Sequence, residues 1–308
     1  MIEQFIKNII NCSEVIEQET IQELWSGYGK IRRFKTEGSN IESIIVKNIK
    51  LSSIYSHPRG WNTNISHQRK LKSYNVETEW YQNWSSKVNT RIPKCYGIEI
   101  IGQEYFIFLE DLDKVGFSIR KSDLTLNELK PCIKWLAQFH SQFINTKPNN
   151  LWEKGTYWHL ETRLDEFNRM EEGFLKENAY KIDSILNNCS FKTILHGDAK
   201  VANFCFNKNG EVAAVDFQYV GGGCGMKDLI YLIGSALSSD ECFKNEEAIL
   251  EYYFNFLNNN EVEKEWRPMY SLAWADFNRF LLGWSPGHPK IDKYSNKMVE
   301  NIKINTQN

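Results

Sequence analysis

The spacing of apolar residues changes along the chain and separates a strand-rich first part from a helix-rich second part. Residues 3–19 have apolar side chains at helical spacing with a polar break in the middle, which predicts two short helices. The segments that follow alternate between short apolar runs and turns, a pattern typical of an antiparallel sheet with one helix. The strands are expected at 20–25, 31–38, 42–51, 96–101 and 104–112, and the helix at 67–88.

After Asp113 the pattern becomes that of long amphipathic helices, expected at 125–144, 157–187, 240–258 and 263–283. Residues 191–218 are the exception, because they contain short extended pieces that end in polar residues. At 308 residues the chain is near the upper limit of what one hydrophobic core supports. We therefore expect two parts, divided near residue 110, with a cleft between them.

Composition and charge exclude several classes of protein. The net charge of −2 leaves no broad positive field of the kind that attracts nucleic acid or anionic lipid. The longest apolar runs are too short to cross a membrane, and the N-terminal acids do not fit a signal peptide. Seven cysteines without a CxxC spacing fit a reducing compartment. We therefore expect a cytoplasmic protein without nucleic-acid or membrane partners, and the oligomeric state stays open.

The stretch ILHGDAKVANFCF, residues 194–206, crowds polar side chains where a buried strand ends. Asn203 in this stretch and Asp216, at the end of the next apolar strand, can lie side by side. An amide oxygen and a carboxylate suit Mg²⁺, which usually also binds waters and substrate phosphate. Asp198 adds a carboxylate that can accept the proton of a hydroxyl. Phosphoryl transfer needs this combination, because it depends mainly on positioning and charge neutralisation.

The motif H-G-D-x-x-x-x-N followed by V-D-F-Q resembles the catalytic core of the small-molecule kinases with a protein-kinase-like fold. Aminoglycoside and choline kinases belong to this family, and the chain is most similar to its ecdysteroid-kinase-like branch. The resemblance implies an α+β, bilobal fold. A nucleotide-binding lobe with an antiparallel sheet and a helix would span 1–109, and a mainly helical catalytic and acceptor-binding lobe 110–308, with a hinge near 109–113.

The resemblance also implies an activity, the transfer of the γ-phosphoryl group of ATP, with Mg²⁺, to a hydroxyl of a small molecule. It makes Asp198 the catalytic base and Asn203 and Asp216 the Mg²⁺ ligands. His196 would support the loop structurally, and Lys200 would contact the transferring phosphate. Whether ATP or GTP is preferred stays open.

Two segments of the first part resemble the family's nucleotide-binding elements. LWSGYGKI is similar to the loop between the first two strands, where Gly27 and Gly29 let the backbone approach phosphate. FIFLEDLD resembles the hinge, so the backbone of Leu109, Glu110 and Asp111 is expected to meet adenine.

A lysine on the third predicted strand resembles the lysine that pairs with phosphate in the family. Lys47 lies late on that strand, and its neighbours are too apolar for the strand to face solvent. Its partner should be a glutamate on the following helix. Glu77 is favoured because the family places this glutamate four residues before a tyrosine, here Tyr81, and Glu79 is the alternative.

The acceptor is expected to be a small hydroxylated molecule. Only twelve positions separate Asp216 from Asp228, and no A-P-E signature follows, which leaves too little chain for the peptide-holding segment of protein kinases. Asp276, Arg279 and Trp284 are the hypothetical acceptor contacts. Aromatic residues could form a cage for a quaternary ammonium group or a flat slot for a sterol-like alcohol, and both stay open.

Two other functions compete with the kinase hypothesis. One is a catalytically inactive, pseudokinase-like regulator that binds nucleotide, and the complete set of motif residues argues against it. The other is a metal-dependent hydrolase that uses His196 and Asp198, but no histidine-rich ligand set accompanies them. His140 is expected to be a core histidine, and Asp228 the N-cap of the next helix. The resemblance implies that Asp228 also steadies the catalytic loop.

Overall fold

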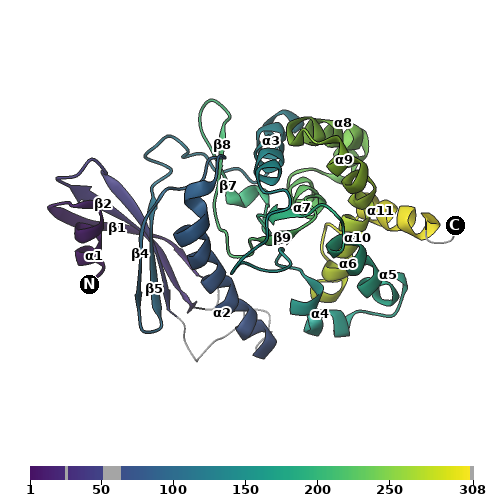
Figure 1. Cartoon of the computed structure of the whole chain (residues 1–308), viewed down its shortest axis with the longest axis horizontal. Helices are drawn as coiled ribbons and strands as arrows, with labels where there is room; N and C mark the ends of the chain where they lie inside the picture. The colour runs from purple at the N-terminus through teal and green to yellow at the C-terminus, as the bar shows by residue number, and fades with distance from the viewer. Residues whose placement is uncertain (25–26, 51–63, 306–308) are drawn as a thin grey trace.

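The computed structural model describes residues 1–24, 27–50 and 64–305. The first part forms a five-stranded sheet whose neighbouring strands are all antiparallel, in the order β1-β2-β3-β5-β4. Helices α1 and α2 accompany this sheet, and Figure 1 shows it at the N-terminal end of the molecule. The bounds are α1 Ile2–Ile10, β1 Glu14–Glu23, β2 Gly29–Glu37, β3 Ser43–Lys50, α2 Asn64–Glu79, β4 Cys95–Ile101 and β5 Glu104–Glu110.

The central strands β3 and β5 are apolar on both faces because both faces are covered. Ile44 and Val46 pack with Ile6 of α1 and Phe108 of β5 on one face. Ile49 belongs to the larger core on the other face, which also contains residues of α2 and of the helical part. Because side chains alternate along a strand, the odd-numbered positions of β3 face α2 and the helices.

The prediction of a second short helix before residue 19 is wrong, because β1 begins at Glu14. Asn11 ends α1 in the left-handed conformation, with φ 51°, and the chain then pairs with β2. The β-branched residues of this segment suit a pleated strand, and two register shifts adapt it to its partner. Strand pairing thus overrides the helical spacing of the apolar residues.

Two of the long predicted helices are broken. Residues 157–187 divide into a 3₁₀ turn and three short helices, and Gly173, with φ 152°, separates two of these helices. Residues 263–283 divide at Pro268, which lies in the 3₁₀ turn Arg267–Met269. Proline has no N–H to donate to a helix and hinders the turn before it.

The second part is mainly helical, as expected. Its bounds are α3 Leu126–Gln142, α4 Leu164–Arg169, α5 Phe174–Glu177, α6 Ala179–Asn187, β6 Thr193–Leu195, β7 Phe204–Phe206, β8 Val212–Ala214, β9 Gly221–Gly223, α7 Met226–Ala236, α8 Ser239–Leu257, α9 Asn260–Trp266, α10 Tyr270–Trp284 and α11 Lys293–Asn305. The short strands form two separate pairs, β6 with β9 and β7 with β8, and lie between the helices and the large sheet (Figure 1). Capping boxes at Thr125 and Ser238 begin α3 and α8.

These elements confirm the α+β class, with an antiparallel sheet and a helix followed by a mainly helical part. The predicted boundary between two lobes, at residue 110, coincides with the end of β5 and stays a prediction. Of the helices in the described ranges, none combines the length and the apolar composition that a membrane crossing needs.

Candidate active site

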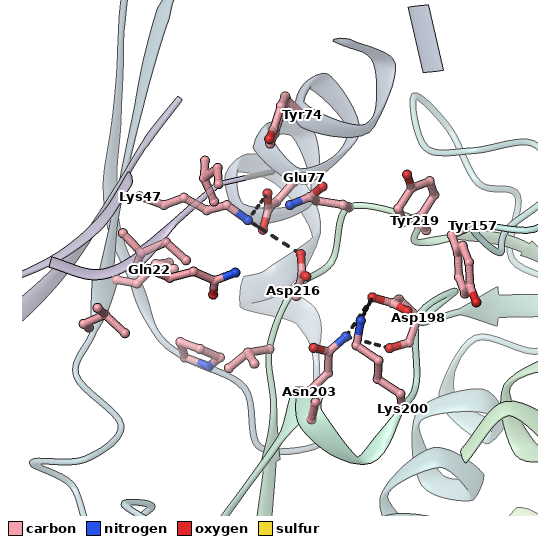
Figure 2. A pocket seen from close by; sticks show the side chains of 18 of the residues that line it. Gln22, Lys47, Tyr74, Glu77, Tyr157, Asp198, Lys200, Asn203, Asp216 and Tyr219 are labelled. Carbon is pink, nitrogen blue, oxygen red and sulfur yellow. Dashed lines mark hydrogen bonds and ion pairs between the residues drawn. The ribbon is translucent and has the colours of Figure 1, made fainter. Parts of the chain in front are cut away.

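A cavity of about 720 Å³ is lined by residues of both the sheet and the helical part. Of the twelve residues predicted for catalysis, nucleotide binding and metal binding, nine line it: Lys47, Glu77, Leu109, Glu110, Asp111, Asp198, Lys200, Asn203 and Asp216. Figure 2 shows Lys47 on one side of the site, Asp198 on the other and Asp216 between them. The other three, Gly27, Gly29 and His196, are not among its lining residues in the described part of the chain.

The loop after β6 carries Asp198 into the cavity. Gly197 precedes it with φ 80°, and a Cβ atom there would lie 2.0 Å from the carbonyl oxygen of Tyr219, so only glycine fits. The Oδ2 atom of Asp198 accepts hydrogen bonds from Lys200 Nζ at 3.1 Å and from Asn203 Nδ2 at 3.0 Å. The carboxylate is thereby oriented by two residues of its own loop.

His196 is buried outside the cavity lining and holds this loop in place. Its Nε2 atom donates to the carbonyl oxygen of Val215 at 3.0 Å, and its Nδ1 atom accepts from the backbone N–H of Asp198 at 3.3 Å. The ring is fully buried, and burial lowers the pKa of the imidazole, so the neutral form fits both contacts. Both ring nitrogens are engaged, which argues against the metal-dependent hydrolase.

Asp228 steadies the loop, as the resemblance implied, but it is not an N-cap. It is the third residue of α7, and Gly225 occupies the cap position. Its carboxylate accepts from the N–H groups of His196 at 2.6 Å and Gly197 at 3.0 Å. It also contacts His140 Nε2 at 3.1 Å, which confirms His140 as a buried core histidine with hydrogen-bond partners.

Replacing Asp228 by alanine should lower the free energy of unfolding by about 2–6 kcal/mol. Two buried N–H groups of the loop lose their acceptor, and each such group costs about 1–3 kcal/mol. Urea unfolding measures the change, with Asp123→Ala at an exposed position as the control. Equal stabilities of the Asp228 and Asp123 variants would contradict this role.

Asp216 and Asn203 meet at one end of the β7–β8 pair, because Asn203 directly precedes β7 and Asp216 follows β8. The N–H of Val215 donates to the carbonyl oxygen of Asn203 at 3.0 Å, which brings the two side chains to one place. Asn203 turns its Nδ2 toward two oxygens of Asp198, so its Oδ1 remains as an acceptor. Asp216 adopts φ 69°, and its buried Oδ1 has no hydrogen-bond donor among the described residues.

These two oxygens fit a Mg²⁺ ion, because hard cations take carboxylate and amide oxygens. The Oδ1 atom of Asp216 also lies 3.6 Å from Lys47 Nζ. Burial acts to raise the pKa of Asp216, but Lys47 and Lys200 outweigh burial and hold the pKa below its ordinary value. Asp216 is therefore an ionised carboxylate, as a metal ligand must be.

Asp198 has the opposite electrostatic balance. Burial raises the pKa of its carboxyl group above the ordinary value, although Lys200 opposes this effect. A raised pKa makes a carboxylate a stronger base. Of the two aspartates, Asp198 is thus the better proton acceptor and Asp216 the better cation ligand.

Lys47 pairs with Glu77. Lys47 lies on the face of β3 that turns toward α2, and its Nζ atom is 2.6 Å from Glu77 Oε2. Both side chains are almost fully buried. Glu79, two residues further, points to another side of the helix. The geometry therefore favours Glu77 over Glu79 as the partner.

The glycine-bearing turn is only partly described, because Trp25 and Ser26 lie outside the described residues. Gly29 has φ 136°, and a Cβ atom there would lie 2.0 Å from the carbonyl oxygen of Asn48 on β3. Gly27 has φ 73° and open space around it. Gly29 is thus required by strand packing, whereas Gly27 leaves room beside the backbone.

The side chains of the predicted hinge are engaged within the protein. Arg33 and Ser43 hold the carboxylate of Asp111, at 2.8 Å and 2.6 Å. Glu110 pairs with Arg91, and its N–H donates to the carbonyl oxygen of Lys94 at 2.8 Å. Any contact of this segment with adenine must therefore use backbone groups other than the N–H of Glu110.

The prediction that Asp276 and Arg279 contact the acceptor is wrong. Both are about 1% exposed, and they form an ion pair with each other at 2.9 Å. Both also bind Trp158, through its Nε1 atom at 3.1 Å and its carbonyl oxygen at 3.0 Å. They therefore position the chain beside the cavity. Trp284, the third predicted contact, does line the cavity.

Several lining residues had no distinctive signal in the sequence. They are Arg69, Lys70, Tyr157, Arg163, Tyr219 and Tyr231. Of these residues, only Tyr219 lies close to a motif in the sequence, three residues after Asp216. The others come from helices and loops whose placement beside Asp198 depends on tertiary packing.

Comparison with known proteins gives one family and several similar folds. The model of the "Ecdysteroid kinase-like family" matches residues 72–155 and 143–264. The structure of choline kinase LicA from Streptococcus pneumoniae is similar at 14% identity, with 97% of this chain and 96% of that chain covered and a TM-score of 0.47. That of an aminoglycoside-3'-phosphotransferase of type VIII is similar at 13% identity, with 85% and 95% covered and a TM-score of 0.48. Curated proteins give no match.

Proposed function

Because the chain belongs to the ecdysteroid kinase-like family, we propose that it is an ATP- and Mg²⁺-dependent kinase that phosphorylates a hydroxyl of a small molecule. One observation carries this proposal. Asp198, Asn203 and Asp216 line the same cavity as the buried Lys47–Glu77 pair. We take residues 1–109 as the nucleotide-binding lobe and 110–308 as the catalytic and acceptor-binding lobe.

Each residue would have a separate task. Asn203 and Asp216 would hold Mg²⁺ through the two oxygens that their neighbours leave available. Lys47, fixed by Glu77, would contact the nucleotide phosphates, with Gly27 and Gly29 in the turn above and Leu109 to Asp111 near adenine. When bound, ATP supplies the γ-phosphoryl group and Mg²⁺ neutralises part of its charge.

Asp198 would accept the proton of the acceptor hydroxyl. The hydroxyl oxygen forms its bond to the γ-phosphorus while the bond from that phosphorus to the β-phosphate oxygen breaks, which leaves ADP and a phosphate monoester. Lys200, 3.1 Å from Asp198 and more exposed than it, can reach the phosphoryl group that moves between the two substrates. His196 and Asp228 would act only by holding the loop.

Mg²⁺-dependent stabilisation by ATP tests the nucleotide part of this proposal. At about a hundred times its dissociation constant, a ligand that binds only the folded state stabilises it by about 2.7 kcal/mol. We expect thermal unfolding to shift upward with ATP and Mg²⁺, and much less with ATP and EDTA. An unchanged unfolding temperature under both conditions would contradict the proposal.

A further inference from the structure

Most charged residues that line the cavity have a partner of opposite charge. At the end near Asp111, Arg33 binds Asp111 and Asp113. In the middle, Lys47 pairs with Glu77, and Lys200 with Asp198. Near the helical wall, Arg163 pairs with the buried Glu166 at 2.8 Å. Charge is thus compensated along most of the cavity.

Two adjacent cations on α2, Arg69 and Lys70, differ from the rest because they bind only neutral groups. Arg69 donates to the carbonyl oxygen of Thr162 at 2.7 Å and to Ser66 Oγ at 3.1 Å. Its side chain is more than nine-tenths buried. No carboxylate of the described residues lies within ion-pair distance of either cation. The segments outside the described ranges contain no Asp or Glu that could compensate them.

Lys70 donates to Gln218 Oε1 at 2.9 Å, and its ammonium group lies 4.7 Å from the ring centre of Tyr74. The carboxylates of Asp216 and Glu77 act on it electrostatically, but both already face Lys47. Burial lowers the pKa of Lys70, as it does for Arg69. Glu166 likewise acts on Arg69 from beyond ion-pair distance. A buried positive charge without an ion-pair partner is costly, so the pair is ready to bind an anion.

The two cations lie beside an aromatic wall next to Asp198. Tyr219 lies close enough to Arg69 to act electrostatically on the pKa of its guanidinium group. Its ring lies 6.0 Å from that of Tyr157, which lies 5.3 Å from the ring of Tyr231. Figure 2 shows Tyr157 and Tyr219 on the same side of the site as Asp198, away from Lys47. This is where an acceptor would lie when its hydroxyl faces Asp198.

From this arrangement we infer that the acceptor carries an anionic group, such as a carboxylate, in addition to the hydroxyl that is phosphorylated. The inference rests on the proposed kinase function and names the substrate class. The anion binds between Arg69 and Lys70, and a flat apolar body packs against Tyr157 and Tyr219. Cationic acceptors, such as a quaternary ammonium alcohol or an amino sugar, are repelled by the same two charges.

Three probes of one shape and different charge test the inference. They are 4-(hydroxymethyl)benzoate, its neutral methyl ester and the cationic 4-(hydroxymethyl)benzylamine. Calorimetric titration in the presence of Mg-ADP measures their binding without requiring transfer. We expect the carboxylate to bind about ten- to a hundredfold more tightly than the ester, as a hydrogen bond to a charged group implies, and the amine most weakly. Binding of the ester or the amine as tight as that of the carboxylate would overturn the inference.

Variants of Arg69 and Lys70 test whether these two residues cause the preference for the carboxylate probe. Arg69→Gln and Lys70→Gln should each remove most of the preference for the carboxylate and leave ester binding unchanged. Arg69→Lys, which keeps the charge, should retain part of it. Lys208→Gln, at an exposed position outside the cavity, is the matched control. Lys70 is only half buried, so we expect Lys70→Gln to fold. This variant tests the inference even when Arg69→Gln does not fold.

The same variants separate the acceptor from the other source of an anion, the nucleotide phosphates. Thermal stabilisation by Mg-ATP should be the same in Lys70→Gln and in the wild type. A loss of this stabilisation with carboxylate preference unchanged would assign the cations to the nucleotide and overturn the inference. If Mg-ATP fails to stabilise even the wild type, the kinase proposal fails. The order of probe affinities then still shows whether Arg69 and Lys70 bind an anion.

Discussion

Asp198→Asn should lower kcat by about a hundred- to ten-thousandfold, the usual contribution of a positioned general base. The amide has nearly the shape of the carboxylate but cannot accept the hydroxyl proton. It can still face Asn203 and Lys200, which hold the side chain now. Thermal stabilisation by Mg-ATP should therefore be retained, and this separates loss of the base from loss of the nucleotide site.

The pH dependence of turnover in the wild type tests the role of the Asp198 carboxylate independently. Since burial raises the pKa of Asp198, the ionised base is lost at a higher pH than for an ordinary aspartate. Turnover should fall as pH decreases through this raised pKa, and the Asn variant should lack this acid limb. Equal kcat values for the variant and the wild type would remove Asp198 from the role of base.

Asp216→Asn should abolish most of the Mg²⁺-dependent stabilisation by ATP, a loss of about 2.7 kcal/mol at a hundredfold excess over the dissociation constant. The substitution removes the negative charge that Mg²⁺ requires and leaves Lys47 without one of its two acidic neighbours. The measurement is the shift in thermal unfolding temperature with ATP, with and without Mg²⁺.

Asparagine is the better substitution here because of the backbone. Asp216 has φ 69°, a left-handed conformation that asparagine tolerates and alanine does not favour. The unfolding temperature of the unliganded variant serves as the control for backbone strain. A full Mg²⁺-dependent shift in Asp216→Asn would show that the metal is held elsewhere.

The loop that contains Asp198 and Asn203 could be predicted because its side-chain contacts are local in sequence. Asp198 and Asn203 belong to one short loop, and their contact at 3.0 Å follows from that loop alone. The pairing of Lys47 with Glu77 required only a strand followed by a helix, with one alternative left open. Such features depend on few long-range contacts, and sequence patterns describe them well.

The predictions from the sequence that are wrong concern features that tertiary packing decides. Residues 14–19 have helical spacing, yet pairing with β2 makes them part of a strand. Asp276 and Arg279 carry charges typical of a binding site, yet they neutralise each other in the interior. Likewise, nothing in the sequence distinguishes Arg69 from a surface arginine. Its lack of a carboxylate partner becomes visible only when its surroundings are known.

Transfer of labelled phosphate from ATP to a small molecule is the most direct test of the proposed kinase activity. The wild type and Asp198→Asn are incubated with γ-labelled ATP, Mg²⁺ and a panel of hydroxy acids, sterols, sugars, choline and aminoglycosides. We expect a labelled phosphate monoester that requires Mg²⁺, forms with the wild type and is nearly absent with the variant. ATP binding without any labelled product across the panel would contradict the kinase proposal and support the inactive nucleotide-binding regulator instead.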